Sequence, residues 1–316
     1  MRARAIRGAI VLLATVFAMK ATADETRLRV GAIDAVLTMP DGSSRPPAAL
    51  LIAGSGPIDH DGNGPQIKPS TLKKLADALA ARGIATLRYD KRGANGWKAE
   101  FGRIEDFRFR DYVDDAVTLA AYLRDSGKCS RVVVIGHSEG GLVAIFTAGR
   151  AAIDRLVLLA TTARRQGDLL KEQLARQLPP AKMKPVAELI DSMMAGKVVD
   201  PVPPGVPAQL GLVPSAQPSI ASIFVADPLP PLRTLTQPIL IAAGGRDRQV
   251  TRQDFDALSA AAPKAETLWL PEMNHVLNDV SSEADNLAAY NQPERALNAE
   301  LVDAIAAFVL RDSATK

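Results

Sequence analysis

Residues 135–141 read Ile-Gly-His-Ser-Glu-Gly-Gly and follow an apolar run over 131–135. This arrangement puts the pattern G-x-S-x-G between a strand-like run and a helix-like stretch, which is the context that a nucleophilic serine on a sharp turn needs. Such a turn forces its central residue into a strained backbone conformation, and neighbouring glycines remove side chains that would clash. We therefore expect Ser138 to stand exposed at the carboxyl end of a strand.

A phosphate-binding turn is the alternative interpretation of these glycines, because dinucleotide-binding folds also place a glycine-rich turn between a strand and a helix. The pattern G-x-G-x-x-G of those folds is absent here. In addition, the carboxylate of Glu139 would repel a phosphate group. The stretch therefore favours a nucleophile over a nucleotide site.

Strand-like apolar runs alternate with helix-like stretches along much of the chain. Several runs are uninterrupted, as strands buried on both faces require. The runs span 48–53, 84–89, 131–135, 155–160, 238–243 and 266–270, and the helix-like stretches span 71–82, 111–124, 141–150 and 296–309. Residues 28–39 are expected to form an antiparallel lead-in hairpin or edge. The pattern predicts an α/β fold with a mostly parallel central sheet flanked by helices.

The pattern changes from 161 to 236, where two amphipathic stretches precede a proline-rich run over 201–218. A disordered linker is the alternative, but the apolar side chains of this segment, Met193 and Phe224 among them, exceed what a solvated tether carries. We therefore expect a core over 24–160 and 237–316. Residues 161–236 are predicted to be a helical cap inserted after the sixth strand.

The first 23 residues combine Arg2, Arg4 and Arg7 with an apolar run over 9–19 and a small-residue ending over 21–23. This combination is typical of a cleavable signal peptide. A membrane anchor is the alternative, but the apolar run is well short of the ~20 residues that span a bilayer. We expect cleavage after Ala23 and an exported protein, with the periplasm as the first expectation and the medium as the second.

Removal of that segment would lower the Lys+Arg count from 38 to 34 against 35 acidic residues, so the net charge would change from +3 to −1. A near-neutral chain without clustered basic runs gives no reason to expect nucleic-acid binding or stable membrane association. The single cysteine, Cys129, can form no disulfide within the chain, so the core must stabilise the fold. A small uncharged molecule is the expected partner, and the oligomeric state is left open.

A serine hydroxyl needs a base within hydrogen-bond reach and an acid that orients the base. The chain has three histidines, His60, His137 and His275. His137 adjoins the serine, and its side chain is expected to point away from it, toward the interior, in a structural role. His60 lies in an early loop and is the weaker candidate. His275 follows the final strand-like run, which fits the chain order serine, acid, histidine, so we assign it as the base.

Asp247 lies after the run over 238–243 and between Ser138 and His275, where the acid of this chain order belongs. An ordinary turn aspartate, or an ion-pair partner of its two arginine neighbours, is the alternative interpretation. The other place for an acid, directly after the run over 155–160, offers only two threonines. We therefore assign Asp247 as the orienting acid.

A developing oxyanion needs two fixed N–H donors, one from the residue after the serine and one from an early loop. We expect these to be the backbone amides of Glu139 and Ser55, with Gly56 as an alternative to Ser55. The early loop continues as Asp59-x-Asp61-x-Asn63-Gly64, like the start of a calcium loop, but its twelfth position is Ser70 where a glutamate is required. A hydrogen-bonded turn is therefore expected there, and the chemistry calls for no metal or organic cofactor.

Taken together, these motifs resemble the α/β-hydrolase superfamily and, within it, the bacterial EstD-like group of serine esterases. The resemblance rests on Gly54-Ser55-Gly56-Pro57, Arg88-Tyr89-Asp90-Lys91-Arg92-Gly93, Gly136-His137-Ser138-Glu139-Gly140-Gly141, Gly245-Arg246-Asp247 and Asn274-His275. It implies a carboxylesterase acting on short- to medium-chain acyl esters, with Ser138, Asp247 and His275 as the triad and Ser55 and Glu139 as oxyanion donors. The charged stretch over 88–93 is expected to be structural, at a strand end near the mouth of the site.

Two other functions stay open. A thioesterase or an aminopeptidase-like acyl hydrolase would use the same three side chains, because a triad does not select the leaving group. A binding protein without catalysis is the alternative from another class, and the complete set of serine, aspartate and histidine argues against it.

Overall fold

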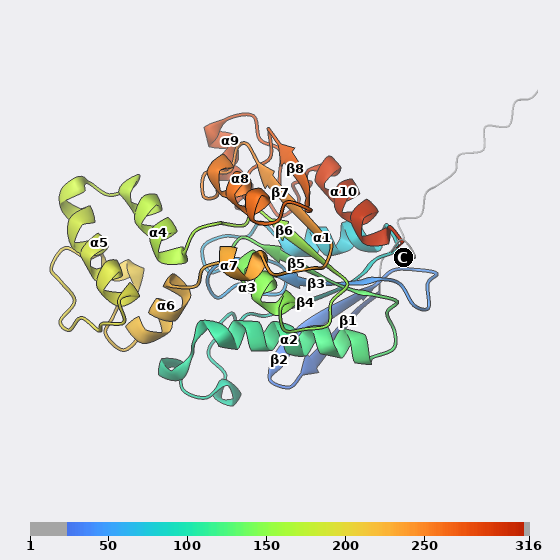
Figure 1. Ribbon diagram of the computed structural model, residues 1–316, viewed down its shortest axis with the longest axis horizontal. Coiled ribbons are helices and arrows are strands. Elements are labelled where there is room, and N and C mark those ends of the chain that lie inside the picture. The colour runs from blue at the N-terminus through green and yellow to red at the C-terminus, as the bar shows by residue number, and fades with distance from the viewer. Residues whose placement is uncertain (1–23, 313–316) are drawn as a thin grey trace, which may run out of the picture.

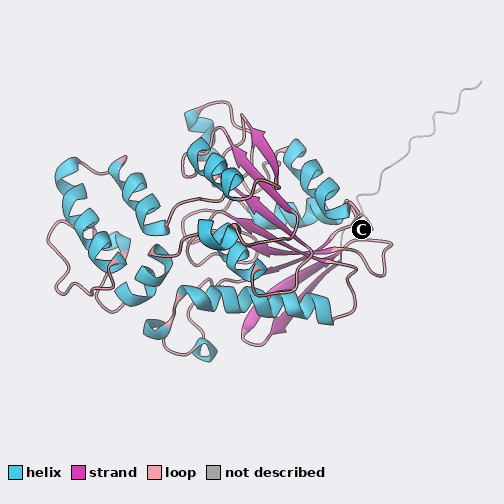
Figure 2. Cartoon of the chain, in the orientation of Figure 1, coloured by secondary structure: helices cyan, strands magenta, loops and turns pink. Residues whose placement is uncertain are grey.

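The structure is a computed structural model that describes residues 24–312, so the expected signal peptide over 1–23 lies outside the described residues. A sheet of eight strands lies at its centre, and helices cover both faces (Figures 1 and 2). The strands are β1 (Asp24–Val30), β2 (Ile33–Met39), β3 (Ala48–Ile52), β4 (Ala85–Tyr89), β5 (Val132–His137), β6 (Arg155–Leu159), β7 (Ile239–Gly244) and β8 (Glu266–Leu270). The α-helices are α1 (Thr71–Ala80), α2 (Phe109–Asp125), α3 (Glu139–Ala148), α4 (Gln166–Ala175), α5 (Pro180–Met194), α6 (Gln217–Phe224), α7 (Leu229–Leu232), α8 (Arg252–Ala261), α9 (Glu283–Ala289) and α10 (Ala299–Leu310).

The strand order across the sheet is β1-β2-β4-β3-β5-β6-β7-β8. β1 and β2 form an antiparallel hairpin, β2 pairs antiparallel with β4, and every later neighbouring pair is parallel. The predicted α/β fold with a mostly parallel sheet is therefore confirmed. Because the carboxyl ends of parallel strands lie at one edge, the loops after β3, β5, β7 and β8 meet there, with β5 near the middle.

Burial on both faces of the sheet explains the uninterrupted apolar runs. In β5, the first five residues are buried, so polar side chains are excluded from either face. Helices α2, α3 and α8 pack on one face in one hydrophobic cluster, and α1 and α10 pack on the other face in a second cluster. In α1, Leu75 and Leu79 lie one turn apart and are fully buried, and burial of each stabilises the fold by about 1.5–3 kcal/mol.

Helices α4 to α7 lie between β6 and β7, as the change of pattern after the sixth strand predicts. In Figure 1, α4, α5 and α6 stand beyond the end of the sheet, at the left of the view. They have a hydrophobic cluster of their own, in which Val186, Ile190 and Met193 of α5 pack with Phe224 of α6. This cluster explains why a segment rich in proline is ordered rather than a solvated tether.

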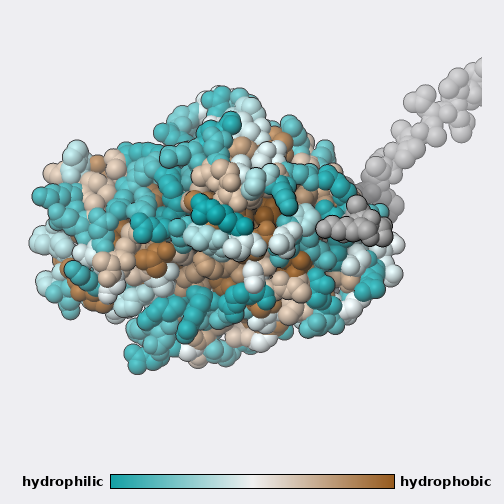
Figure 3. Space-filling view, viewed as in Figure 1, coloured by the Kyte–Doolittle hydropathy of each residue, from teal (hydrophilic) through white to brown (hydrophobic). Residues whose placement is uncertain are grey.

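The outer surface is mixed. On the face shown in Figure 3, polar residues surround scattered hydrophobic ones, some of which lie over the inserted helices at the left. None of the described helices combines the length and the hydropathy that crossing a bilayer requires.

Candidate active site

Ser138 occupies the sharp turn between β5 and α3, with φ 55° and ψ −123°. A positive φ is unfavourable for a residue with a side chain and costs about 1–3 kcal/mol, so the surrounding packing has to maintain it. The glycines of the motif allow that packing. A Cβ at Gly136 would overlap the carbonyl oxygen of Gly140, one at Gly140 would overlap the carbonyl oxygen of Ile52, and one at Gly141 would overlap Thr161. The turn therefore has the strained, closely packed geometry that the sequence predicts.

His275 and Asp247 lie side by side at the same edge of the sheet. The His275 Nδ1 atom is 2.8 Å from the Asp247 Oδ2 atom, and both side chains are buried. The other oxygen of Asp247, Oδ1, accepts the backbone N–H groups of Gln249 and Val250 at 2.7 and 2.9 Å. The carboxylate is thus fixed from three directions and holds the Nδ1 side of the imidazole, which leaves Nε2 for a substrate-side proton.

The arginines beside Asp247 are engaged elsewhere. Arg246 pairs with Glu272 and Arg248 pairs with Glu283, so neither takes the carboxylate of Asp247. The alternative interpretation of Asp247 as an ion-pair partner of its neighbours is therefore not what the structure shows.

Buried asparagines fix the loop that carries His275. The Asn274 side chain accepts the backbone N–H of Asn278 at 3.0 Å and donates to Asn286 Oδ1 at 3.1 Å. Asn286 in turn donates to the carbonyl of Arg246 at 2.8 Å. These hydrogen bonds connect the loop after β8 to the loop after β7, so His275 and Asp247 are held by one network.

Ser138 and His275 line one small cavity of about 100 Å³ together with Gly54, Ser55 and His137. The remaining lining residues are uncharged. They come from the loop after β3, the start of α1, the loops after β7 and β8, and the end of α9. The structure thus brings together Ser138, His275 and Ser55, three of the site residues expected from sequence, at one hollow at the carboxyl edge of the sheet.

His137 lies directly beside His275. It is one of the residues around the cavity of Ser138, its ring centroid is 5.0 Å from that of His275, and its Nε2 atom donates to the backbone carbonyl of His275 at 2.7 Å. Burial, followed by the nearby charge of His275, lowers the pKa of His137 to about 4, so the ring is neutral near pH 7. This contact fits the structural role expected of His137, because the ring holds the backbone of His275. Nothing in the sequence pattern indicates a contact between residues so far apart.

The expected oxyanion donors lie around the nucleophile. Glu139 is the first residue of α3, so its N–H has no carbonyl one turn earlier in the helix to bond. Gly54 packs directly against the nucleophile, since a Cβ on it would lie 3.2 Å from the Cβ of Ser138. Ser55 follows and is exposed to the cavity, whereas Gly56 lines a neighbouring cavity. The arrangement favours Ser55 over Gly56 as the second donor.

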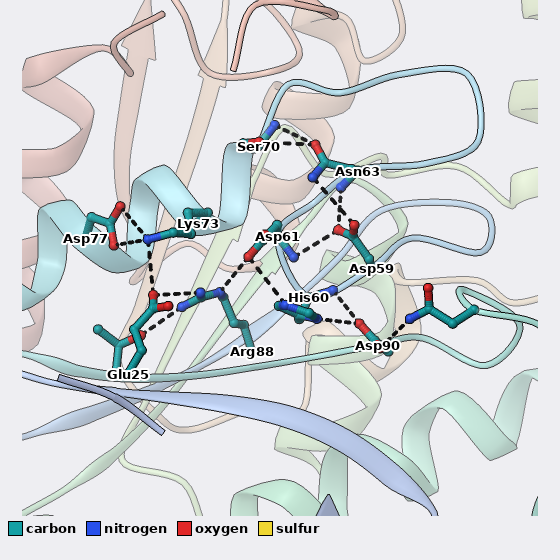
Figure 4. Close-up of polar contacts among 12 residues, drawn as sticks. Glu25, Asp59, His60, Asp61, Asn63, Ser70, Lys73, Asp77, Arg88 and Asp90 are labelled. Carbon is teal, nitrogen blue, oxygen red and sulfur yellow. Dashed lines mark hydrogen bonds and ion pairs between the residues drawn. The ribbon is translucent and has the colours of Figure 1, made fainter. Parts of the chain in front are cut away.

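The charged turn over 88–93 follows the end of β4, as expected, and Arg92 and Gly93 line the same neighbouring cavity as Gly56, whereas Arg88 and Lys91 are buried. Arg88 and Lys91 are 1% and 2% exposed. Arg88 donates to Glu25 of β1 and to Asp61, as Figure 4 shows. Buried cations need such partners because desolvation is expensive, and sequence reasoning missed these partners because they are distant along the chain.

The stretch that opens like a calcium loop is a hydrogen-bonded turn. Asp59 Oδ1 accepts the backbone N–H groups of Asp61 and Asn63, and Asn63 Oδ1 accepts that of Ser70 (Figure 4). His60, the weaker candidate base, is bonded through Nδ1 to Asp90 at 2.6 Å. That hydrogen bond raises the pKa of His60 despite partial burial, and His60 does not line the cavity of Ser138.

Comparisons with known proteins give the family and the fold of this chain. A family model described as the alpha/beta hydrolase family matches residues 49–290. Esterase EstD of Thermotoga maritima is 26% identical over 300 residues, which cover 91% of this chain and 68% of that protein.

Two solved structures share the fold at low identity. Est1E from Butyrivibrio proteoclasticus has a TM-score of 0.55 at 15% identity, covering 90% of this chain and 97% of the other. A thioesterase domain from the curacin biosynthetic pathway has a TM-score of 0.53 at 14% identity, covering 92% of this chain and 100% of the other. At these identities the likeness concerns the fold alone.

Proposed function

The chain belongs to the alpha/beta hydrolase family, and we propose that it is a serine carboxylesterase for short- to medium-chain acyl esters. Ser138 attacks the ester carbonyl, and His275 removes the serine proton and later delivers a proton to the leaving oxygen. Asp247 holds the imidazole and stabilises its charged form. The backbone amides of Ser55 and Glu139 bind the oxyanion, and water then hydrolyses the acyl-enzyme.

One observation carries this proposal. A serine with φ 55° lines the same cavity as a histidine whose Nδ1 lies 2.8 Å from a buried carboxylate. A backbone strain of this kind persists only where the surrounding structure enforces it, and it recurs at sites where the strained residue reacts. The similarity to an esterase from Thermotoga maritima supports the ester as the substrate.

The cavity at Ser138 supports an uncharged acyl group. Within residues 24–312, no aspartate, glutamate, lysine or arginine lines the cavity at Ser138. An aminopeptidase would need a carboxylate there for the substrate's α-amino group, so the lining favours an ester over an aminoacyl substrate.

A second cavity, of about 590 Å³, lies beside the oxyanion loop at Gly56 and Pro57. It reaches Ile220 and Ile223 of α6, and its walls are largely apolar. Its volume is in the range of ligand pockets, so it can hold a medium acyl chain that extends from the small cavity.

Hydrolysis of p-nitrophenyl acetate, butyrate and octanoate by the chain from Asp24 onward tests the proposal, with Ser138→Ala as the matched variant. Activity is expected in the wild type and its loss, by several orders of magnitude, in the variant. A wild type that cleaves only a butyryl thioester or an aminoacyl p-nitroanilide would place the activity in a different class. Absence of both turnover and Ser138 labelling by a fluorophosphonate would favour the binding-protein alternative.

The chain-length proposal has its own variant. Ile223→Trp fills part of the second cavity, so kcat/KM for the octanoate should fall about tenfold or more while kcat/KM for the acetate stays within about twofold. Equal losses for both esters would mean that the second cavity holds no acyl chain.

We also propose export, on the basis of the N-terminal sequence alone. Expression of the whole chain in a bacterial host, followed by N-terminal sequencing of the periplasmic and medium fractions, should give a protein that starts at Asp24. A cell-associated product that retains Met1 would contradict this.

A further inference from the structure

Lys91 is a buried lysine in direct contact with both expected oxyanion segments. It follows the end of β4, and its Nζ atom donates to the carbonyl oxygen of Gly54 at 2.7 Å and to Glu139 Oε1 at 2.8 Å. The same Nζ lies 4.2 Å from the centroid of the Tyr112 ring. One ammonium group thus reaches the loop after β3 and the turn after β5 at the same time.

Stability alone does not account for such a pair. A buried ion pair is often no more stabilising than apolar side chains of the same volume, because both charges lose their hydration. The side chains of Lys91 and Glu139 are 1% and 6% exposed. Burial opposes the charge of Lys91, but Glu139 raises the pKa of the ammonium above its ordinary value, so Lys91 stays protonated and keeps all its donors.

The bond to Gly54 fixes the direction of the Ser55 N–H. The peptide unit between these residues is planar, and its C=O and N–H point in opposite directions. An ammonium that holds the Gly54 oxygen on one side therefore turns the Ser55 N–H toward the other side. Gly54 itself packs against Ser138, so the peptide that the ammonium holds lies directly beside the serine. A glycine peptide rotates easily when nothing holds it, so the bond limits a real freedom.

We propose that Lys91 is a positioning residue that holds the backbone amides of Ser55 and Glu139 at a fixed separation for the oxyanion. The inference rests on the proposed function. Through Gly54, Lys91 orients one donor, and through the Glu139 side chain it anchors the residue that provides the other. Lys91 is not among the described residues that line either cavity, so its loss should affect the transition state, in which the oxygen carries charge, more than substrate binding.

The variant Lys91→Met keeps the length of the side chain and removes its donors, and Lys74→Met is the matched control. Lys74 is a partly buried lysine that also donates to a backbone carbonyl, that of Arg295 at 2.7 Å, away from the oxyanion loop. With p-nitrophenyl butyrate, kcat per fluorophosphonate-labelled serine should fall by about 10- to 10³-fold in Lys91→Met, with KM changed less than about threefold. Lys74→Met should keep both constants.

A second readout separates positioning from a purely structural role. Ser138 adds to the carbonyl carbon of a trifluoromethyl ketone, and the carbonyl oxygen becomes an oxyanion. The inhibition constant of such a ketone should therefore rise in Lys91→Met in parallel with the loss of kcat. Because Lys91→Met leaves Glu139 buried without a partner, the double variant Lys91→Met/Glu139→Met, which removes both charges, should fold and still show the loss.

A wild type that hydrolyses esters, together with single and double variants whose kcat per labelled serine stays within about threefold of it, would overturn this inference alone. A wild type without ester hydrolysis would overturn the proposed function and the inference with it. A fall in thermal stability in Lys91→Met, without a change in kcat or in ketone affinity, would show that Lys91 only stabilises the fold.

Discussion

Replacement of Asp247 by asparagine should abolish turnover while leaving the fold intact, and the structure shows why. The Asp247 Oδ1 atom accepts two backbone N–H groups, and Oδ2 faces His275 Nδ1. An asparagine can keep the two backbone bonds only if its carbonyl oxygen takes the Oδ1 position. The amide NH₂ then faces Nδ1, which must accept a hydrogen bond and so moves the ring proton to Nε2. In that tautomer His275 cannot accept the proton of Ser138.

The magnitude follows from the hydrogen bonds. The opposite amide orientation would leave two buried backbone donors facing an NH₂ group, at about 1–3 kcal/mol each. A preference of about 2–6 kcal/mol keeps the inactive tautomer in at least about 95% of molecules. Since only the minor tautomer of His275 can accept the serine proton, kcat should fall by about 30-fold at the lower end of this range and by about 10⁴-fold at its upper end.

The assay is the initial rate with p-nitrophenyl butyrate, with Ser138→Ala as background. Asp254→Asn is the matched control, because the side chains of Asp247 and Asp254 are both fully buried and Asp254 also accepts backbone N–H groups, from Ala163 and Thr251. It contacts no histidine, so Asp254→Asn should lower thermal stability and keep kcat within about threefold. Retention of more than a tenth of the wild-type kcat in Asp247→Asn, or equal losses in the two variants, would refute the reasoning.

Two further predictions concern the turn and its surroundings. In Gly140→Ala the new Cβ would overlap the Ile52 carbonyl oxygen, a backbone atom that cannot move aside, so the free energy of unfolding measured in urea should fall by about 2 kcal/mol or more. Gly149→Ala is the control and should change the free energy of unfolding little, because the nearest atom to its new Cβ is 3.7 Å away. Equal effects of the two variants would contradict the packing argument. The His137 ring should titrate by NMR at about pH 4, because burial lowers its pKa. Between about pH 4 and 6.5 the unfolded chain binds that proton and the folded chain does not, so the free energy of unfolding should decrease as the pH is lowered through this window, and should decrease less in His137→Gln. A titration midpoint near 6.5 would contradict this prediction.

The sequence predicts the parts of this molecule that local chemistry determines. Uninterrupted apolar runs indicate strands such as β5 because a strand covered on both faces has no place for polar side chains. The glycines around Ser138 indicate the turn because only they tolerate its close packing. The adjacency of Asp247 and His275 could be predicted from chain order, since consecutive parallel strands bring their following loops together.

The parts that sequence reasoning missed depend on distant contacts. The pairing of Lys91 with Glu139 and the hydrogen bond from His137 to the His275 carbonyl join segments 48 and 138 positions apart. Neither leaves a periodic pattern. A glutamate directly after the nucleophile was a usable signal for the first, because a carboxylate buried in such a turn needs a cation. The inserted helices follow no strand register, so their arrangement could not be derived from spacing either.

The position of the inserted helices also sets the order in which the active site can assemble during synthesis. β3, β5 and β6 pair with one another and belong to the first half of the chain, so the turn at Ser138 can form as soon as they emerge. β7 and β8, whose loops carry the acid and the base, join the sheet only after α4 to α7 have been made. Closing a longer loop costs little extra free energy, but it is slower than pairing neighbours. The turn at Ser138 thus needs only strands that come early in the chain, whereas the proposed triad is complete only when β7 and β8 have joined the sheet.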